Sequence, residues 1–192
     1  EVLLVANHPA DDTQGKREVQ FGPEIWIDKD DFRQEANKKF KRLVLGKRVR
    51  LRGGYVIEAE RCDVDADGEV TAVYASIVPQ TLGEDPDDGV KAKGVIHWVD
   101  ATTGMSAEIR SYDRLFNVED PSKADNMDDV INPTSLVVGQ AIVEASLASA
   151  DPEDRFQFER EGYFVADRFD HAGEKLVFNR VIGLRDTWAG ND

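Results

Sequence analysis

The sequence has a single cysteine, Cys62, among its 192 residues. One cysteine excludes an internal disulfide framework and is consistent with a reducing cytoplasm, which is the expected location. Long hydrophobic runs are also missing: none approaches the roughly 20 apolar residues that a membrane-spanning helix needs, and no signal peptide is visible. We therefore expect a folded domain with no membrane partner.

Motifs for catalysis are absent as well. The chain holds no glycine-rich dinucleotide fingerprint, no Walker A loop and no serine nucleophile elbow. His8, His97 and His171 are far apart, and none is spaced like a zinc ligand relative to another histidine or to Cys62. We predict no catalytic residue and no metal site, and expect His97 to be a packed, hydrogen-bonded side chain.

The segment from Asp63 to Gly68 (DVDADG) matches the beginning of an EF-hand calcium loop. The position where a bidentate glutamate would complete the loop is Tyr74, and the flanking residues alternate as strands do. A hairpin turn at Asp67-Gly68 explains the segment better than a calcium site.

Positive charge is scarce except in one window. The chain carries 24 basic and 38 acidic residues, a formal net charge of −14. Residues 38–52 (KKFKRLVLGKRVRLR) contain eight Lys or Arg and no acid, so the other 177 residues carry 16 basic against 38 acidic side chains. A basic window on an acidic surface attracts a polyanion and restricts where it binds. RNA or DNA is the first partner to consider, and a merely solvated charge run is the alternative.

The order of residues inside the window favours binding. Alternation from Lys47 to Gly53 predicts a strand with Arg48, Arg50 and Arg52 on one face and Val49 and Leu51 on the other. Arginine offers a planar set of donors that suits phosphate oxygens and base edges. The pattern is typical of a recognition strand.

Short alternating segments separated by turn residues predict an all-β fold. The expected strands are Val2 to Val5, Glu24 to Ile27, Arg48 to Arg61, Glu69 to Val78, Gly94 to Val99, Ala107 to Tyr112, Phe156 to Phe164 and Leu176 to Leu184. Only two short helical segments are expected, from Asp31 to Phe40 and from Asp125 to Ile131. The acidic segment Leu82 to Gly89 (LGEDPDDG) reads as a surface loop and divides the chain into expected domains 1–90 and 91–192.

A second polar group lies in FQFEREGYF, residues 156–164. Alternation would put Phe156, Phe158 and Phe164 on one face with Arg160, and Gln157 on the other. Unstacked bases need ring or guanidinium planes to rest on, and amide or guanidinium donors at their edges. Core packing is the better explanation for the phenylalanines, which leaves Gln157 and Arg160 as candidate RNA-binding residues.

Five phrases carry a family resemblance: KRLVLGKRVRLRGGYVI (41–57), KGVIHWV (93–99), EIRSYDRLF (108–116), FQFEREGYF (156–164) and FNRVIGLRDTW (178–188). In this order they resemble the C-terminal anticodon-binding region of bacterial-type glutaminyl-tRNA synthetase, from about Asn7 to Trp188. The resemblance implies two β-barrels of the ribosomal protein L25-like type with exchanged N-terminal strands, and base pockets between them. It also implies an upstream catalytic domain that uses ATP and magnesium, whereas this fragment would hold no cofactor.

The resemblance also implies roles for six residues. Lys41 and Arg42 match groups that contact the third anticodon base, Arg50 and Arg52 match groups near the first, and Gln157 and Arg160 match groups that read the central uracil. The expected partner is the anticodon loop of tRNA(Gln), bound by a monomer. Two departures weaken the match.

The first departure concerns a further arginine that the family uses for the central base, which would lie upstream of Glu1 in what we expect to be a piece of a longer protein. In the second, Ala10 replaces an asparagine that often follows Asn7-His8-Pro9. The alternatives are an L25-type module for structured RNA, the homologous region of an archaeal-type glutamyl-tRNA synthetase, a free-standing enzyme, and an acidic β protein with no role in RNA binding.

Overall fold

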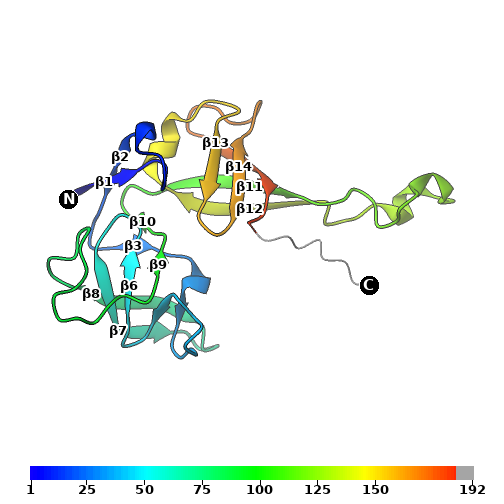
Figure 1. Ribbon diagram of the computed structural model, residues 1–192. Coiled ribbons are helices and arrows are strands. Elements are labelled where there is room, and N and C mark those ends of the chain that lie inside the picture. Colours follow the sequence, from blue (N-terminus) through cyan, green and yellow to red (C-terminus); the bar gives the residue numbers. More distant parts are fainter. Residues whose placement is uncertain (185–192) are drawn as a thin grey trace. The chain divides into compact units, whose positions relative to one another are not determined.

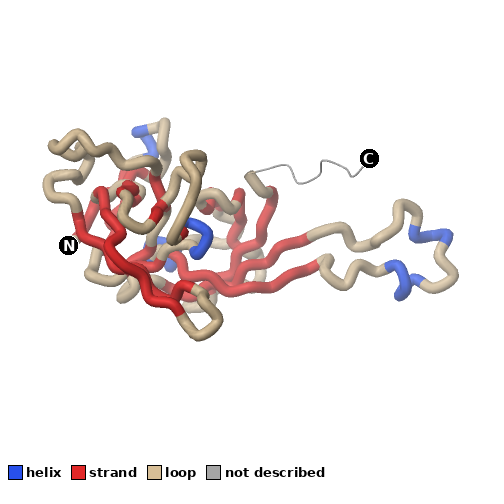
Figure 2. The backbone as a smooth tube through the Cα atoms, turned by 90° about the horizontal axis from the view of Figure 1, so that it is seen from below, coloured by secondary structure: helices blue, strands red, loops and turns tan. Residues whose placement is uncertain are grey.

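The computed structural model describes residues 1–184, and strands predominate throughout them (Figures 1 and 2). The helices within residues 1–184 are short 3-10 segments of three to five residues: η1 (Asp12–Gln14), η2 (Lys29–Asp31), η3 (Pro121–Lys123), η4 (Met127–Val130) and η5 (Ala145–Ser149). The all-β prediction is confirmed. Barrel closure and the exchange of N-terminal strands stay predictions.

The chain forms two compact units, one from Glu1 to Thr103 and the other from Gly104 onward. The expected domain boundary near residue 90 lies in the loop before β9 (Val95–Ile96). That strand pairs with β6 (Arg48–Leu51) in a parallel ladder, which attaches residues 95 and 96 to the first unit.

The first unit is built around a four-stranded sheet with the strand order β8-β7-β6-β9. Three smaller two-stranded ladders accompany it, and they pair β1 with β2, β3 with β10 and β4 with β5. The further strands of the unit are β1 (Val2–Ala6), β2 (Lys16–Gln20), β3 (Ile25–Trp26), β4 (Phe32–Arg33), β5 (Leu43–Val44), β7 (Val56–Val64), β8 (Val70–Ile77) and β10 (Val99–Asp100).

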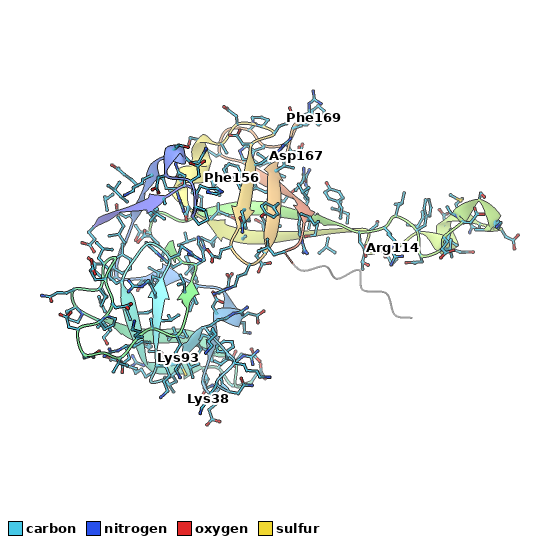
Figure 3. The ribbon with its side chains drawn as sticks, viewed as in Figure 1. Lys38, Lys93, Arg114, Phe156, Asp167 and Phe169 are labelled. Carbon is cyan, nitrogen blue, oxygen red and sulfur yellow. The ribbon has the colours of Figure 1, made fainter. Side chains whose placement is uncertain are left out.

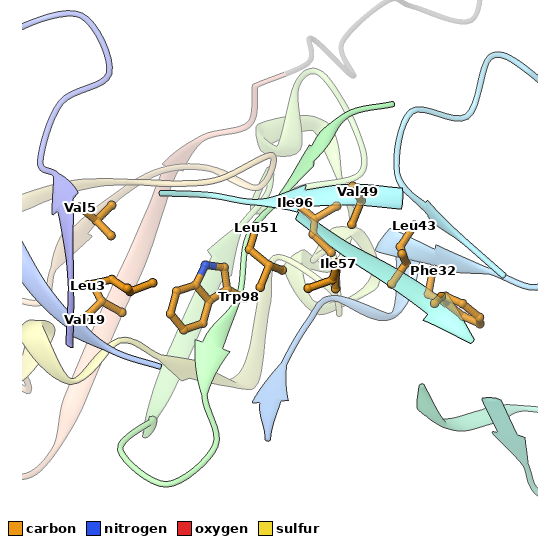
Figure 4. Close-up of a cluster of buried hydrophobic side chains, with 11 residues drawn as sticks. Leu3, Val5, Val19, Phe32, Leu43, Val49, Leu51, Ile57, Ile96 and Trp98 are labelled. Atoms are coloured by element: carbon orange, nitrogen blue, oxygen red, sulfur yellow. The ribbon is translucent and has the colours of Figure 1, made fainter. Parts of the chain in front are cut away.

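Alternating burial gives the first unit one core. Val49 and Leu51 of β6 are completely buried, as the alternation predicted. They pack with Leu3, Val5 and Val19 of β1 and β2, and with a larger group that Figure 4 shows: Phe32, Leu43, Ile57, Ile96 and Trp98. The apolar side of β6 is therefore fixed, which leaves its arginines on the opposite side.

The second unit contains one five-stranded sheet with the order β12-β11-β15-β14-β13. Its strands are β11 (Met105–Tyr112), β12 (Leu136–Val143), β13 (Arg155–Phe158), β14 (Gly162–Ala166) and β15 (Leu176–Ile182). β11 and β15 run parallel, and the other neighbouring strands run antiparallel. Residues 113–135 extend the β11–β12 hairpin and contain η3 and η4 (Figure 2).

Three expected segments are interrupted. The strand predicted from Arg48 to Arg61 is two strands, because a turn at Gly53 and Gly54 reverses the chain between β6 and β7. The strand predicted from Gly94 to Val99 is β9 and β10 with His97 and Trp98 between them, and that from Phe156 to Phe164 is the β13–β14 hairpin.

The helix predicted from Asp31 to Phe40 is wrong, because Phe32 and Arg33 pair with β5 as a strand. The other short helical segment, predicted from Asp125 to Ile131, is present as η4, and Asn126 caps it by accepting a hydrogen bond from the Asp128 N–H.

The hairpin predicted at Asp67-Gly68 is confirmed. β7 and β8 are antiparallel on either side of the turn, and Gly68 has a φ of +85°, which glycine adopts without strain. The Asp65 carboxylate accepts hydrogen bonds from the N–H groups of Asp67 and Glu69. That carboxylate therefore organises the turn itself.

Candidate nucleic-acid interface

The basic window of residues 38–52 occupies the turn before β5, the strand β5 and the strand β6. On β6 the side chains of Arg48 and Arg50 are half-buried and lie opposite the buried Val49 and Leu51. Arg52 follows in the turn and is exposed, and its backbone is held by β9 and by the Trp98 indole, which donates to the Arg52 carbonyl at 3.0 Å. The predicted arginine face is present on β6 for Arg48 and Arg50, whereas Arg52 lies beyond the end of the strand.

Arg48 lies between two carboxylates. Its Nε donates to Glu58 on the neighbouring strand β7 at 2.8 Å, in the register that places the two residues opposite each other. Its Nη1 contacts Asp88 of the acidic loop at 2.7 Å. These bonds raise the pKa of Arg48. The guanidinium of Arg48 is thus oriented by one acid of the sheet and one acid of the loop.

Arg50 donates mainly to backbone carbonyls. Its Nη1 contacts the carbonyl oxygens of Thr81 at 2.6 Å and Gly54 at 3.4 Å, and its Nη2 contacts that of Glu84. Asp85 lies 3.6 Å from Nη2. Arg50 therefore fixes the acidic loop against β6, an arrangement that could not be predicted from the residue pattern.

The acidic loop of residues 82–89 is anchored at its beginning by Thr81. This buried hydroxyl accepts from the Val56 N–H at 2.9 Å and donates to the Val78 carbonyl at 2.7 Å. The pKa of Asp88 is lowered by the Val90 N–H and then by Arg48, and that of Asp85 is lowered by Lys91 and then by Arg50. The loop consequently presents ionised acids to the arginine face.

Lys41 and Arg42 lie just before β5. Lys41 is exposed, and its backbone packs so closely on Gly94 that a side chain at position 94 would collide with the Lys41 carbonyl. Lys93, next to that glycine, donates its N–H to the Arg48 carbonyl at 3.3 Å. Residues 93 and 94 thus contact Lys41 and Arg48 of the basic window, and Figure 3 labels Lys93 and also Lys38, at the beginning of the window.

Arg42 has a more defined position than Lys41. Its Nε lies 3.2 Å from Asp31, its Nη1 donates to the Asp30 carbonyl at 2.8 Å, and about a quarter of its side chain is exposed. Its Cζ lies 5.7 Å from the centre of the Phe40 ring. Phe40 and Asp31 are neighbours of the site that sequence reasoning missed, although Phe40 stands inside the basic window.

Gln157 and Arg160 belong to the second unit. Gln157 is exposed on β13 and lies opposite the exposed Tyr163 of β14. Arg160 does not share the phenylalanine face as expected, because it lies in the turn with a φ of +65°. The three phenylalanines pack with Phe178 in the core, as the preferred interpretation held. Within the second unit, the β13–β14 hairpin brings Gln157 close to an aromatic side chain.

The described residues hold no metal-like arrangement. Residues 1–184 contain no group of three or more His, Cys, Asp or Glu side chains placed to hold a metal ion. In the same part of the chain, no helix has the length and apolar character needed to cross a membrane.

The six candidate residues form two sets of donors. Four lie in the first unit and two lie in the second.

Comparison with known proteins gives matches along the chain. Two family models, each described as tRNA synthetases class I (E and Q), anti-codon binding domain, match residues 1–78 and 95–167. The glutamine–tRNA ligase of Photobacterium profundum is 60% identical over 189 residues, which are 98% of this chain and 34% of that protein. The glutamine–tRNA ligase of Vibrio cholerae is 56% identical over all 192 residues, and that of Serratia proteamaculans is 57% identical over 189.

The chain spans about a third of the length of the curated relatives that it matches. The two matched segments cover most of the first unit and much of the second. The FNRVIGLRDTW phrase ends at Trp188, outside the described residues, and therefore has a structural account only through Leu184. The chain belongs to the anticodon-binding domain family of the class I tRNA synthetases for glutamate and glutamine.

Proposed function

We propose that this chain reads the anticodon of tRNA(Gln) for a longer, monomeric, cytoplasmic glutamine–tRNA ligase. The observation that carries the proposal is the basic surface of β6 and of the turn that follows it. It is held rigidly because Val49 and Leu51 are buried behind the strand and the Arg52 backbone is bonded to Ile96 and Trp98. A donor at a fixed position loses little conformational freedom on binding. More of the free energy of its hydrogen bonds therefore contributes to affinity and to the choice of base. The high identity to glutamine–tRNA ligases supports the choice of tRNA.

Each set of donors has a proposed base. Lys41 and Arg42 contact the third anticodon base, Arg52 contacts the first with Arg50 beside it, and Gln157 and Arg160 read the central uracil. The carbonyl contacts of Arg50 support a role in shaping the first-base site. Arg52 is exposed on a fixed backbone, which supports a direct contact between its side chain and the base.

The chemistry of ligation belongs to the rest of the proposed longer protein. An upstream domain of that protein would bind ATP and magnesium and join glutamine to the tRNA, while this chain supplies affinity and selection. Phosphate contacts from the lysines add affinity with no sequence preference, and base-edge contacts add discrimination. The replacement at Ala10 makes the turn after His8 a poor candidate for an anticodon-loop contact.

The test is a titration of this chain with fluorescent anticodon stem-loops at low salt. The panel contains the CUG and UUG loops, the UUC loop, and single changes at each anticodon position. We expect tighter binding of the glutamine loops by roughly 5- to 150-fold for each well-placed base contact. Equal affinity for every loop would contradict anticodon reading and favour an L25-type module that binds structured RNA by its backbone.

A further inference from the structure

Asp31 and Arg42 are brought together by a strand pairing that is short but fixed. Phe32 of β4 pairs with Leu43 of β5 in a parallel ladder, and Asp31 and Arg42 are the residues immediately before this pair. Phe32 and Leu43 are buried in the core of the first unit, with exposed fractions of 8% and 1%. The backbone therefore holds the carboxylate and the guanidinium side by side, with the Nε of Arg42 3.2 Å from Oδ1 of Asp31.

The burial of Asp31 makes this contact unusual on so charged a surface. Its side chain is 2% exposed, whereas that of Arg42 is 26% exposed. A buried carboxylate needs strong partners, since it has lost its hydration. The acid thus lies on the inner side of the pair, and the arginine extends from it toward solvent.

Two further contacts limit the motion of Arg42. Its Nη1 donates to the Asp30 carbonyl at 2.8 Å, and its Cζ lies 5.7 Å from the centre of the Phe40 ring, which the Cζ of Arg33 also approaches, at 4.8 Å. These contacts involve Nε and Nη1 of Arg42, and about a quarter of its side chain remains exposed. Arg42 is therefore held through Nε and Nη1 while part of its side chain faces solvent.

This geometry suits one base better than another. A guanine edge presents two acceptors, O6 and N7, which an arginine contacts with two parallel hydrogen bonds, whereas cytosine presents an amino donor that a guanidinium repels. The glutamine anticodons CUG and UUG end in guanine, and the UUC anticodon ends in cytosine. A fixed arginine would distinguish them, while a mobile one would also reach phosphate oxygens, which carry no sequence information.

We propose that Asp31 is a positioning residue that orients Arg42 for guanine at the third anticodon position, and so sets the discrimination between glutamine and glutamate anticodons. The inference rests on the proposed function, because it assumes that Arg42 faces the third base. It adds a specificity role for a buried acid that makes no contact with RNA itself.

The first test compares the chain with its Asp31→Asn variant on the UUG and UUC stem-loops. We expect the ratio of the two affinities to fall about tenfold, because the amide holds the guanidinium less firmly than the carboxylate does. Preferences at the first and second anticodon positions should be unchanged. Asp63→Asn is the matched control: it removes the same charge from another arginine pair of the same unit, Arg61–Asp63, and should leave the ratio as it is.

A double-mutant cycle with Arg42→Lys separates positioning from a general effect on the fold. Lysine keeps a charge beside Asp31 but lacks the planar donors. In the Arg42→Lys background, Asp31→Asn should cause no further change in the third-base ratio. An equal tenfold loss in both backgrounds would overturn the proposal, because Asp31 would then act independently of Arg42.

A measurement on the unsubstituted chain covers the case in which Asp31→Asn does not fold. The Nε–H resonance of Arg42, identified by its loss in Arg42→Lys, should exchange slowly with water before RNA is added and should remain after the UUG loop binds. Rapid exchange, as at an exposed arginine, would overturn the proposal.

The binding results distinguish failure of this proposal from failure of the proposed function. If the unsubstituted chain binds UUG and UUC equally, the proposed function fails. If the unsubstituted chain discriminates and Asp31→Asn discriminates equally well, only the role of Asp31 fails.

Discussion

At the scale of single residues, the same side-chain type performs different tasks within one short strand and its turn. Arg48 is paired with two carboxylates, Arg50 with backbone carbonyls, and Arg52 follows on an exposed turn whose backbone is fixed. Their spacing in sequence is identical, so sequence patterns treat them as equal. The partners that distinguish them come from β7 and from the loop after β8, which are distant in sequence.

Substitution of Arg52 tests the assignment of the first base. Arg52→Ala should weaken binding of the CUG loop and reduce the preference at the first anticodon position, by roughly 5- to 150-fold if a two-hydrogen-bond contact is lost. Arg61→Ala, which removes an exposed arginine of β7 outside the basic window, is the control. Fluorescence titration with loops changed at each position measures both. A uniform loss over all loops would instead assign Arg52 to a phosphate.

Residue-scale features were predictable where they depend on periodicity alone. The alternation of Val49 and Leu51 with arginines identified the buried and the basic face of β6 correctly. The position of Arg160 was not predictable in this way, because the strand containing Phe156 and Phe158 ends before it and the chain turns. The role of Asp31 depends on a pairing between β4 and β5 that leaves no periodic signal in two-residue strands.

At the scale of elements, the acidic loop of residues 82–89 and the strand β6 form one electrostatic unit. The sequence alone indicated a surface loop between the two expected domains. The contacts of Asp88 with Arg48 and of Asp85 with Arg50 connect this loop to RNA binding, because a loop acid and an RNA phosphate would compete for the same donors.

Neutralising Asp88 should therefore strengthen RNA binding at low salt. Asp88→Asn removes one carboxylate that competes with RNA phosphate for Arg48. Glu58 remains and keeps the Arg48 guanidinium on β6. We expect affinity to rise roughly two- to fivefold, the scale of one exposed ion pair, and the gain to fade at high salt. Asp120→Asn, which makes the same charge change beside Lys123 in the second unit, should have a smaller effect. A fall in affinity would show that the loop organises the arginine face for binding.

Some strands were predicted close to their observed bounds, and others were missed. β1, β8, β11 and β15 lie close to their expected positions, whereas β2 and β12 were not expected at all. β12 is an edge strand with exposed residues on both faces, so its sequence shows no alternation of burial. The expected helix after Asp31 failed for a related reason, since ladder pairing with β5 outweighs a weak capping signal.

At the scale of the whole molecule, each unit has its own core, and the second has a charged network beside it. Asp167 accepts from the Asn179 amide at 2.7 Å and from the N–H groups of Phe169 and Asp170, and Arg110 lies 3.3 Å away. Of these, the Asn179 hydrogen bond contributes most to lowering the pKa of Asp167 to about 2. Figure 3 labels Asp167 together with the exposed Phe169 in the following turn.

The low pKa of Asp167 predicts an acid-sensitive second unit. Because the folded pKa is below the unfolded value of 3.8, the ionised carboxylate stabilises the fold above about pH 4, and this contribution is lost as pH falls toward 2. Its full size is roughly 2 to 2.5 kcal/mol. Urea unfolding between pH 2 and 7 should show this loss in the unsubstituted chain and a smaller one in Asp167→Asn. Identical pH profiles would contradict the role of Asp167.

Reading of anticodon bases by donors on a rigid surface is best checked by the ratio of the chain's affinities for the UUG and UUC stem-loops at several salt concentrations. Phosphate contacts weaken as salt rises, whereas base contacts set the ratio. We expect both affinities to fall with salt while the ratio stays well above one in favour of UUG. A ratio near one at every salt concentration would show that the chain does not read the third anticodon base.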